Sequence, residues 1–122
     1  MRVFEPSDCD DFRLVFGRSE IEYDRAKEEA NRTKHGYSLA GAAHLLGRLI
    51  LLIGSLHFAK RVVVVSGEVR HEMMTVDDGR VVFIVATMRP GDKIRVISFR
   101  RASADERAVF AEITGFRETE GR

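Results

Sequence analysis

The chain has 122 residues, enough for one domain with a modest hydrophobic core and too few for two. Its single cysteine excludes an internal disulfide and fits a reducing compartment. The apolar run Leu49 to Ala59, which has no charged side chain, is about half of the roughly 20 residues that a membrane-spanning helix needs. Aspartates at positions 8, 10 and 11 stand where a signal peptide requires apolar residues. We therefore expect a cytoplasmic protein that does not enter a membrane.

The net charge of +1 hides a strong asymmetry along the chain. Residues 5–30 carry 9 acids against 4 bases, whereas residues 31–101 carry 12 bases against 5 acids, a local charge of +7. A basic middle between acidic ends is compatible with an anionic polymer as partner. The alternative is that these charges only solvate the surface.

The first half of the chain predicts two helices. Asp24 is suited to cap a helix over residues 25–35, and Gly36 to end it. Ser38 can begin a second helix that reaches about residue 47.

The second half predicts a sheet, because short segments rich in β-branched residues alternate with glycine or charge. Asp77-Asp78-Gly79 and Arg89-Pro90-Gly91-Asp92 are typical of hairpin turns. Ser103 then begins a C-terminal helix with Glu106 in a capping box. The expected strands are 49–53, 61–66, 70–76, 80–87 and 94–99, with shorter extended segments at 12–16 and 21–23.

Together these elements predict an α+β fold: two N-terminal helices, a twisted antiparallel sheet of four to five strands and a C-terminal helix. We expect residues 1–20 to be an extension, residues 21–116 to form the domain, and residues 117–122 to be a frayed tail.

His35 is the first candidate for chemistry, because it follows Lys34 at the predicted end of a helix. The helix dipole at that end should favour an imidazolium and raise the histidine pKa, which suits a general acid. The alternative is a histidine that only caps the helix.

Arg100 leaves the last predicted strand, and its planar fork suits two phosphate oxygens. Strand alternation places Arg95 on the opposite face, so the two arginines can share a site only if a bulge or strong twist intervenes. The alternative for both is a surface ion pair with Glu106 or Asp92.

Other arginines are candidates for RNA binding. Arg70 and Arg80 begin adjacent predicted strands and can form part of a basic rim, or be merely solvated, and Arg101 continues the basic turn after Arg100. The four histidines and the cysteine lack metal-ligand spacing, and no cofactor motif is present. We therefore expect neither a metal site nor a cofactor.

Several of these residues match a known family at its characteristic spacing, over roughly residues 21–110. The matching residues are Glu22-Tyr23-Asp24, Lys27, Ala30-Asn31, Lys34-His35-Gly36, Arg95 to Arg100, Ala102 and Glu106. In these positions the chain resembles the BrnT toxins of bacterial type II toxin–antitoxin systems, whose fold is similar to RelE-type ribonucleases.

This resemblance implies a ribonuclease that arrests growth, with Lys34, His35, Arg95 and Arg100 as catalytic candidates. Arg95 is included mainly because the family motif has arginine there. The resemblance also implies a cognate antitoxin that covers the basic surface, and operator DNA bound only through that antitoxin. Without metal ligands, the chemistry that fits is RNA cleavage through its own 2′-hydroxyl.

The alternative function is a BrnT-like module that binds a protein or nucleic acid without cleaving it. The apolar stretch 49–65 favours this alternative, as does Met74-Thr75 where the family has an Ile-Gly pair. A homo-oligomer is compatible with either function.

Overall fold

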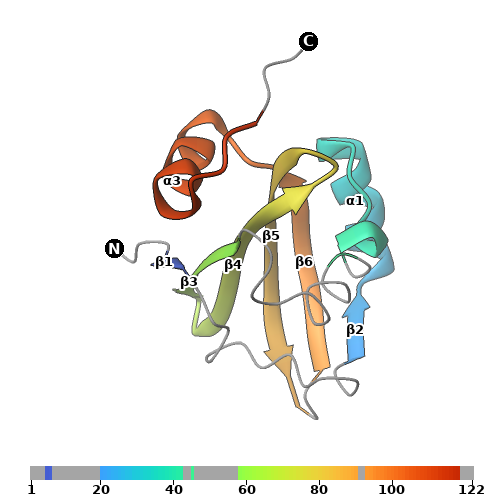
Figure 1. Cartoon of the computed structure of the whole chain (residues 1–122). Helices are drawn as coiled ribbons and strands as arrows, with labels where there is room; N and C mark the ends of the chain where they lie inside the picture. Colours follow the sequence, from blue (N-terminus) through green and yellow to red (C-terminus); the bar gives the residue numbers. More distant parts are fainter. Residues whose placement is uncertain (1–4, 7–19, 43–44, 46–57, 91–92, 119–122) are drawn as a thin grey trace.

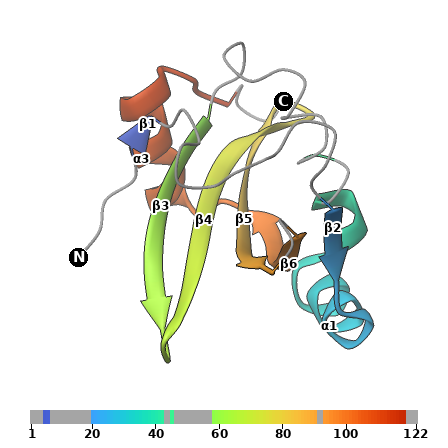
Figure 2. The same ribbon diagram turned by 90° about the horizontal axis from the view of Figure 1, so that it is seen from below.

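Six β-strands form one mixed sheet in the computed structural model, which describes residues 5–6, 20–42, 45, 58–90 and 93–118 (Figure 1). The strands are β1 (Glu5–Pro6), β2 (Glu20–Tyr23), β3 (Phe58–Val65), β4 (Glu68–Asp77), β5 (Arg80–Arg89) and β6 (Lys93–Arg101). Their order across the sheet is β1-β3-β4-β5-β6-β2. Helix α1 (Arg25–His35) lies beside β6, and helix α3 (Ala104–Thr114) lies beside β1 and β3 (Figures 1 and 2).

The prediction of an antiparallel sheet is correct for the four long strands and wrong for the sheet as a whole. Strands β3 to β6 pair antiparallel in sequence order. Strand β2 instead pairs parallel with β6, with Glu20 opposite Lys93 and Tyr23 opposite Val96. The partners are distant along the chain, so no turn between them indicates their direction.

Local signals in the sequence set the boundaries of the helices as predicted. Asp24 Oδ1 accepts hydrogen bonds from the Ala26 and Lys27 N–H groups, at 2.8 and 3.2 Å, which caps α1. Gly36 ends the helix with φ +75°, in the left-handed region that favours glycine. Ser103 and Glu106 form the predicted capping box of α3.

The expected second helix is present in its first turn. Residues Leu39–Ala42 and Leu45 are helical, and Ser38 Oγ accepts a hydrogen bond from the Ala40 N–H at 3.1 Å. Its predicted end near residue 47 lies outside the described residues. The same holds for the expected strands 12–16 and 49–53, most of the extension 1–20, and the end of the tail 117–122.

Two-residue turns join the strands of the first two hairpins. Asp78 and Gly79 have φ +53° and +78°, as expected for the type I′ turn that their sequence predicts. Ser66 and Gly67 take the same conformation, with φ +51° and +80°, between β3 and β4. Because this turn type follows the twist of the strands, it closes both hairpins without a loop.

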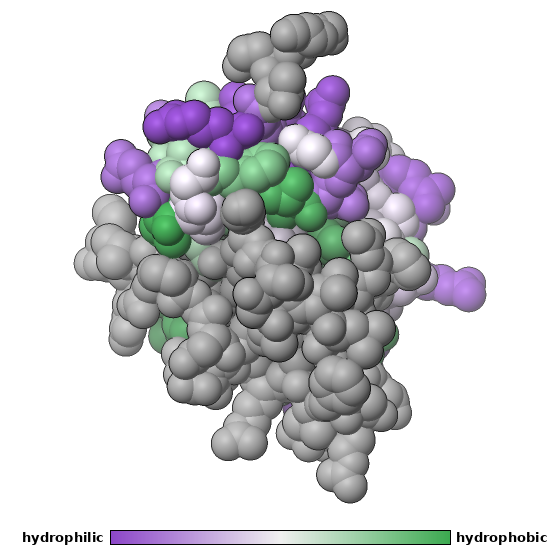
Figure 3. Space-filling view, viewed as in Figure 1, coloured by the Kyte–Doolittle hydropathy of each residue, from purple (hydrophilic) through white to green (hydrophobic). Residues whose placement is uncertain are grey.

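Hydrophobic cores lie on both faces of the sheet. Alternate residues of β5, Val82 and Ile84, pack with Leu39 on one face, while Val81 and Phe83 pack with α3 on the other. Burial on both faces explains why β5 reads as an almost continuous apolar run. Seen as in Figure 1, hydrophilic residues lie along the upper rim and hydrophobic ones directly below it (Figure 3).

Helix α3 covers only the end of its face near β1 and β3, where Phe110 packs on Ala59 and Met74. We call the remainder of this face, whose residues are half-buried, the open face. It comprises Arg61, Arg70, Glu72, Val85, Arg95, Ser98 and Arg100.

Asn31 joins α1 to the edge of β6. Its Oδ1 accepts a hydrogen bond from the Phe99 N–H at 3.2 Å, and its Nδ2 donates to the carbonyl oxygens of Phe99 at 2.7 Å and Tyr37 at 2.8 Å. The side chain is 7% exposed. One amide therefore satisfies three backbone groups in a buried place, where an unpaired group is costly.

We predict that Asn31→Ala lowers the free energy of unfolding by about 2–4 kcal/mol, because buried backbone groups lose their partners. Thr33→Ala, an exposed position on the same helix, is the matched control and should change stability little. Urea denaturation of both variants measures the difference. Equal midpoints for the two would show that the Asn31 hydrogen bonds contribute no net stability.

Candidate functional site

A β-bulge decides which side chains of β6 share a face. Val85 pairs with Ser98 and Ala86 with Val96, which leaves Ile97 as the extra residue. Alternation is therefore reset between the two ends of the strand. Arg95 lies opposite Thr87 and Arg100 lies opposite Phe83, so both arginines are on one face of the sheet. This bulge is the irregularity that the two arginines were expected to need in order to share a site.

Each arginine of the open face has a glutamate partner. The pairs are Arg61–Glu72 at 2.5 Å, Arg70–Glu68 at 2.9 Å, Arg95–Glu22 at 2.7 Å and Arg100–Glu106 at 2.8 Å. The ion pair with Glu106, which was the alternative for Arg100, is thus present, while Arg95 pairs with Glu22. The open face is consequently covered by ion pairs, and a phosphate must either displace a carboxylate or bind the N–H groups that the carboxylate leaves free.

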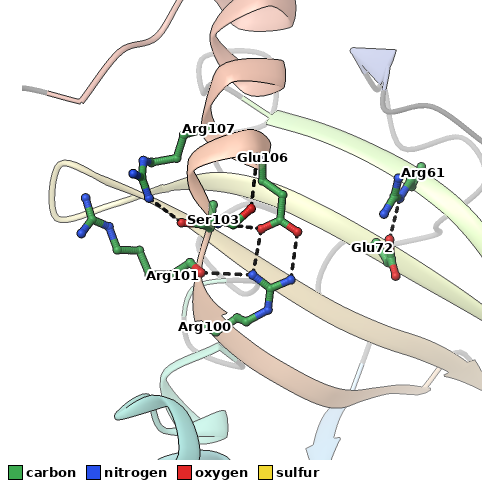
Figure 4. Close-up of polar contacts among 8 residues, drawn as sticks. Arg61, Glu72, Arg100, Arg101, Ser103, Glu106 and Arg107 are labelled. Carbon is green, nitrogen blue, oxygen red and sulfur yellow. Dashed lines mark hydrogen bonds and ion pairs between the residues drawn. The ribbon is translucent and has the colours of Figure 1, made fainter.

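Arg100 is the most firmly held of these arginines (Figure 4). Its Nη1 and Nη2 donate to the two carboxylate oxygens of Glu106 at 2.8 and 2.9 Å, and Nη1 also donates to the Arg101 carbonyl at 3.2 Å. Its guanidinium carbon lies 4.2 Å from the centre of the Phe83 ring. The hydrogen bonds to Glu106 raise the arginine pKa, so the group is always charged.

A pocket of about 180 Å³ lies between α1 and the bulge of β6. Its lining comes from one side of the helix and two strand residues: Lys27, Ala30, Asn31, Lys34, His35, Ile97 and Ser98. Ser98 also belongs to the open face, so it connects the pocket with the arginines. Lys34 and His35 both line this pocket.

The expectation that His35 has a raised pKa is wrong in direction. Burial lowers its pKa, and the positive charges of Lys34 and Arg100 lower it further. A neutral imidazole therefore predominates at neutral pH, which suits a proton acceptor better than a donor. Arg100 is thus one of the two cations that lower the His35 pKa.

The structure does not bring the other RNA-binding candidates together. Arg70 lies on the open face, but Arg80 is an exposed residue opposite Asp77, directly after a hairpin turn. Arg101 forms an ion pair with Glu118 near the C-terminus. Both lie at the end of the sheet away from Arg70.

Sequence reasoning missed several residues of the site. Lys27, Ala30 and Asn31 precede Lys34 by seven, four and three residues, so helical spacing alone puts them on one side of α1. Arg61 and Glu72 are harder to find, because their contact requires the register of β3 on β4. Within the described ranges, no three histidine, cysteine, aspartate or glutamate residues are grouped to hold a metal, and no helix is long and apolar enough to cross a membrane.

Comparisons with known proteins agree with this geometry. The model of the family described as the ribonuclease toxin BrnT of type II toxin–antitoxin systems matches residues 23–106. The chain belongs to the BrnT family. The crystal structure of the Brucella abortus ribonuclease toxin BrnT matches with a TM-score of 0.51 and 21% identity, over 70% of this chain and 97% of that one, which shows a shared fold. A search of curated proteins found no match.

We predict that the His35 pKa in this BrnT-family protein lies below the ordinary value of about 6.5. Lys34→Gln should raise it, because one neighbouring cation is removed. Lys27→Gln serves as the control. It removes another cation that lines the pocket, and Lys27 is not among the causes of the lowered His35 pKa. NMR titration of the imidazole measures all three values, and a wild-type value above 6.5 would contradict the prediction.

Proposed function

We propose that this BrnT-family protein is a metal-independent endoribonuclease that cleaves RNA through the RNA's own 2′-hydroxyl. The observation that carries the proposal is the proximity of two kinds of group. His35, whose pKa is lowered, lines a pocket that borders the open face and its arginines. The positive charge of Arg100 contributes to the lowering of that pKa. Such a site offers a proton acceptor and fixed positive charge without a metal.

In this mechanism neutral His35 accepts the proton of the 2′-hydroxyl as its oxygen attacks the adjacent phosphate. Lys34 and Arg100 stabilise the negative charge that accumulates on the phosphate oxygens. The departing 5′-oxygen takes a proton from water. The products are a 2′,3′-cyclic phosphate and a 5′-hydroxyl end.

The open face provides a path for the rest of the RNA backbone. Arg95 and Arg70 lie on it beside Arg61, each with one glutamate partner that a phosphate can replace. Because Arg80 and Arg101 lie elsewhere, we assign them no contact with the scissile region.

The biological role follows from the family. Membership of a type II toxin–antitoxin family implies a cognate antitoxin. We propose that the antitoxin covers the open face, that free toxin arrests growth by cutting RNA, and that operator DNA is bound only through the antitoxin.

We predict that His35→Ala and Arg100→Ala each reduce RNA cleavage by about 10²-fold or more, since one loses proton transfer and the other charge stabilisation. Arg80→Ala is the control and should cleave as the wild type does. Gel analysis of a labelled RNA, with EDTA and with a 2′-O-methylated version as further arms, measures this. Cleavage of the methylated RNA, or equal cleavage by all variants, would refute the assignment.

We also predict that Arg70→Ala weakens binding of 2′-O-methylated RNA. The slope of log K against log salt concentration should decrease in magnitude by about 1, because one phosphate contact is lost. Arg80→Ala should leave the slope unchanged. Fluorescence anisotropy at several salt concentrations gives both slopes. Equal slopes for the two variants would place the backbone path off the open face.

A binding module without catalysis is the second candidate. The tip of the β3–β4 hairpin exposes Val64 at 65%, Val65 at 41% and Val69 at 47%, an unusual concentration of apolar surface. A partner chain that covers these valines would explain their exposure. A purified protein that binds a partner through the hairpin and leaves every RNA intact would favour this function over the ribonuclease.

A further inference from the structure

We propose that Glu106 is a positioning residue of the site: it holds one end of the Arg100 guanidinium so that the other edge, carrying Nε–H and the second Nη2–H, meets the scissile phosphate. The proposal rests on the proposed ribonuclease function and adds a residue from α3 to it.

The donor pattern of Arg100 supports this division. A guanidinium has five N–H groups in a fixed plane. Three of them are engaged, two with the Glu106 carboxylate and one with the Arg101 carbonyl. Among the described residues, none accepts from Nε or from the second Nη2 hydrogen. These two parallel donors form the edge that can bind two phosphate oxygens together.

Glu106 is itself fixed, so it can act as a rigid support. Its Oε1 accepts from the Ser103 N–H at 2.8 Å, and its own N–H donates to Ser103 Oγ at 3.2 Å, at the start of α3. On the other side, the Phe83 ring lies against the guanidinium. Arg100 is thus restrained by the Glu106 carboxylate and the Arg101 carbonyl (Figure 4). The Phe83 ring adds a third restraint, and only the free edge is available.

A carboxylate beside an RNA phosphate must weaken electrostatic attraction, so Glu106 does not serve affinity. Its benefit is orientation: an arginine that already points at the phosphate loses no conformational freedom in the transition state. This distinction predicts different effects on kcat and KM. Loss of the charge should leave RNA binding unchanged or tighter while chemistry slows.

Glu106→Gln tests this prediction, because glutamine keeps the capping box but presents an N–H group to Arg100. We expect kcat to fall about tenfold, as for a misplaced catalytic group, with KM unchanged or lower. Asp105→Asn is the matched control, because it removes an exposed carboxylate from the same turn of α3 that does not pair with Arg100. Its kcat should equal that of the wild type even if its Tm falls.

The double variant Arg100→Ala/Glu106→Gln gives a second criterion. If Glu106 acts through Arg100, the double variant is no slower than Arg100→Ala alone. An equal fold-loss from Glu106→Gln with and without Arg100 would overturn the proposal. An unchanged kcat for Glu106→Gln would also overturn the proposal. A higher kcat/KM for this variant would overturn it too, because Glu106 would then be an inhibitory mimic of phosphate.

Binding measurements separate this proposal from the ribonuclease assignment. We expect the Arg100 Nε–H resonance to shift when 2′-O-methylated RNA is added to the wild type and to shift much less in Glu106→Gln. A wild type that cleaves no RNA would refute the proposed function, and the resonance would still decide the role of Glu106. Equal shifts in both proteins would overturn the positioning role.

Discussion

The side-chain amide of Asn31 forms hydrogen bonds with the edge of β6 beyond the point where β2 ends. The pocket depends on this arrangement, in which a side chain takes the place of a neighbouring strand. Strand β2 pairs with β6 only as far as Val96, and the backbone of Phe99 is then satisfied by Asn31. A longer β2 would satisfy the same groups but would occupy the space of the pocket. A carboxylate could not replace the amide, because both a donor and an acceptor are required. The hydrogen bonds therefore hold α1 against the sheet while leaving room for a ligand.

The bulge at Ile97 lies at the same place along β6, and the two features act together. If β6 alternated regularly, with Ile97 paired opposite Val85, Ser98 and Arg100 would point to the opposite face, into the core that contains Leu39 and Ile84. With the bulge, Ser98 faces both the pocket and the arginines, and Phe99 turns inward against Tyr37, with ring centres 4.9 Å apart. Bulges of this kind commonly redirect side chains next to active sites. One inserted residue thus joins a helix terminus and a sheet face into a single site.

The features that the sequence predicted correctly depend on neighbours in the chain. Asp24 and Gly36 bound α1, Asp78-Gly79 turns a hairpin, and Ser103 with Glu106 caps α3, all within a few residues. The features that it missed depend on contacts between distant segments. The parallel pairing of β2 with β6 and the contact of Arg61 with Glu72 are of this kind. The predicted direction of the His35 pKa shift was wrong for the same reason. The dipole of α1 could be anticipated from the sequence, but burial and the charge of Arg100 could not.

The pairing of every arginine on the open face also changes how the charge of this protein should be understood. The basic middle segment suggested a bare cationic surface, yet Glu22, Glu68, Glu72 and Glu106 neutralise it locally. These carboxylates come from β2, β4 and α3, so acidic and basic parts of the chain meet on one surface. Unpaired arginines would attract any polyanion through long-range forces that salt screens. A ligand of paired arginines must instead form hydrogen bonds of good geometry with guanidinium groups that already bind carboxylates. This requirement favours a phosphate at the correct position over one that is only nearby. For the ribonuclease proposed above, selectivity would then rest on the positions of the guanidinium groups and not on net positive charge.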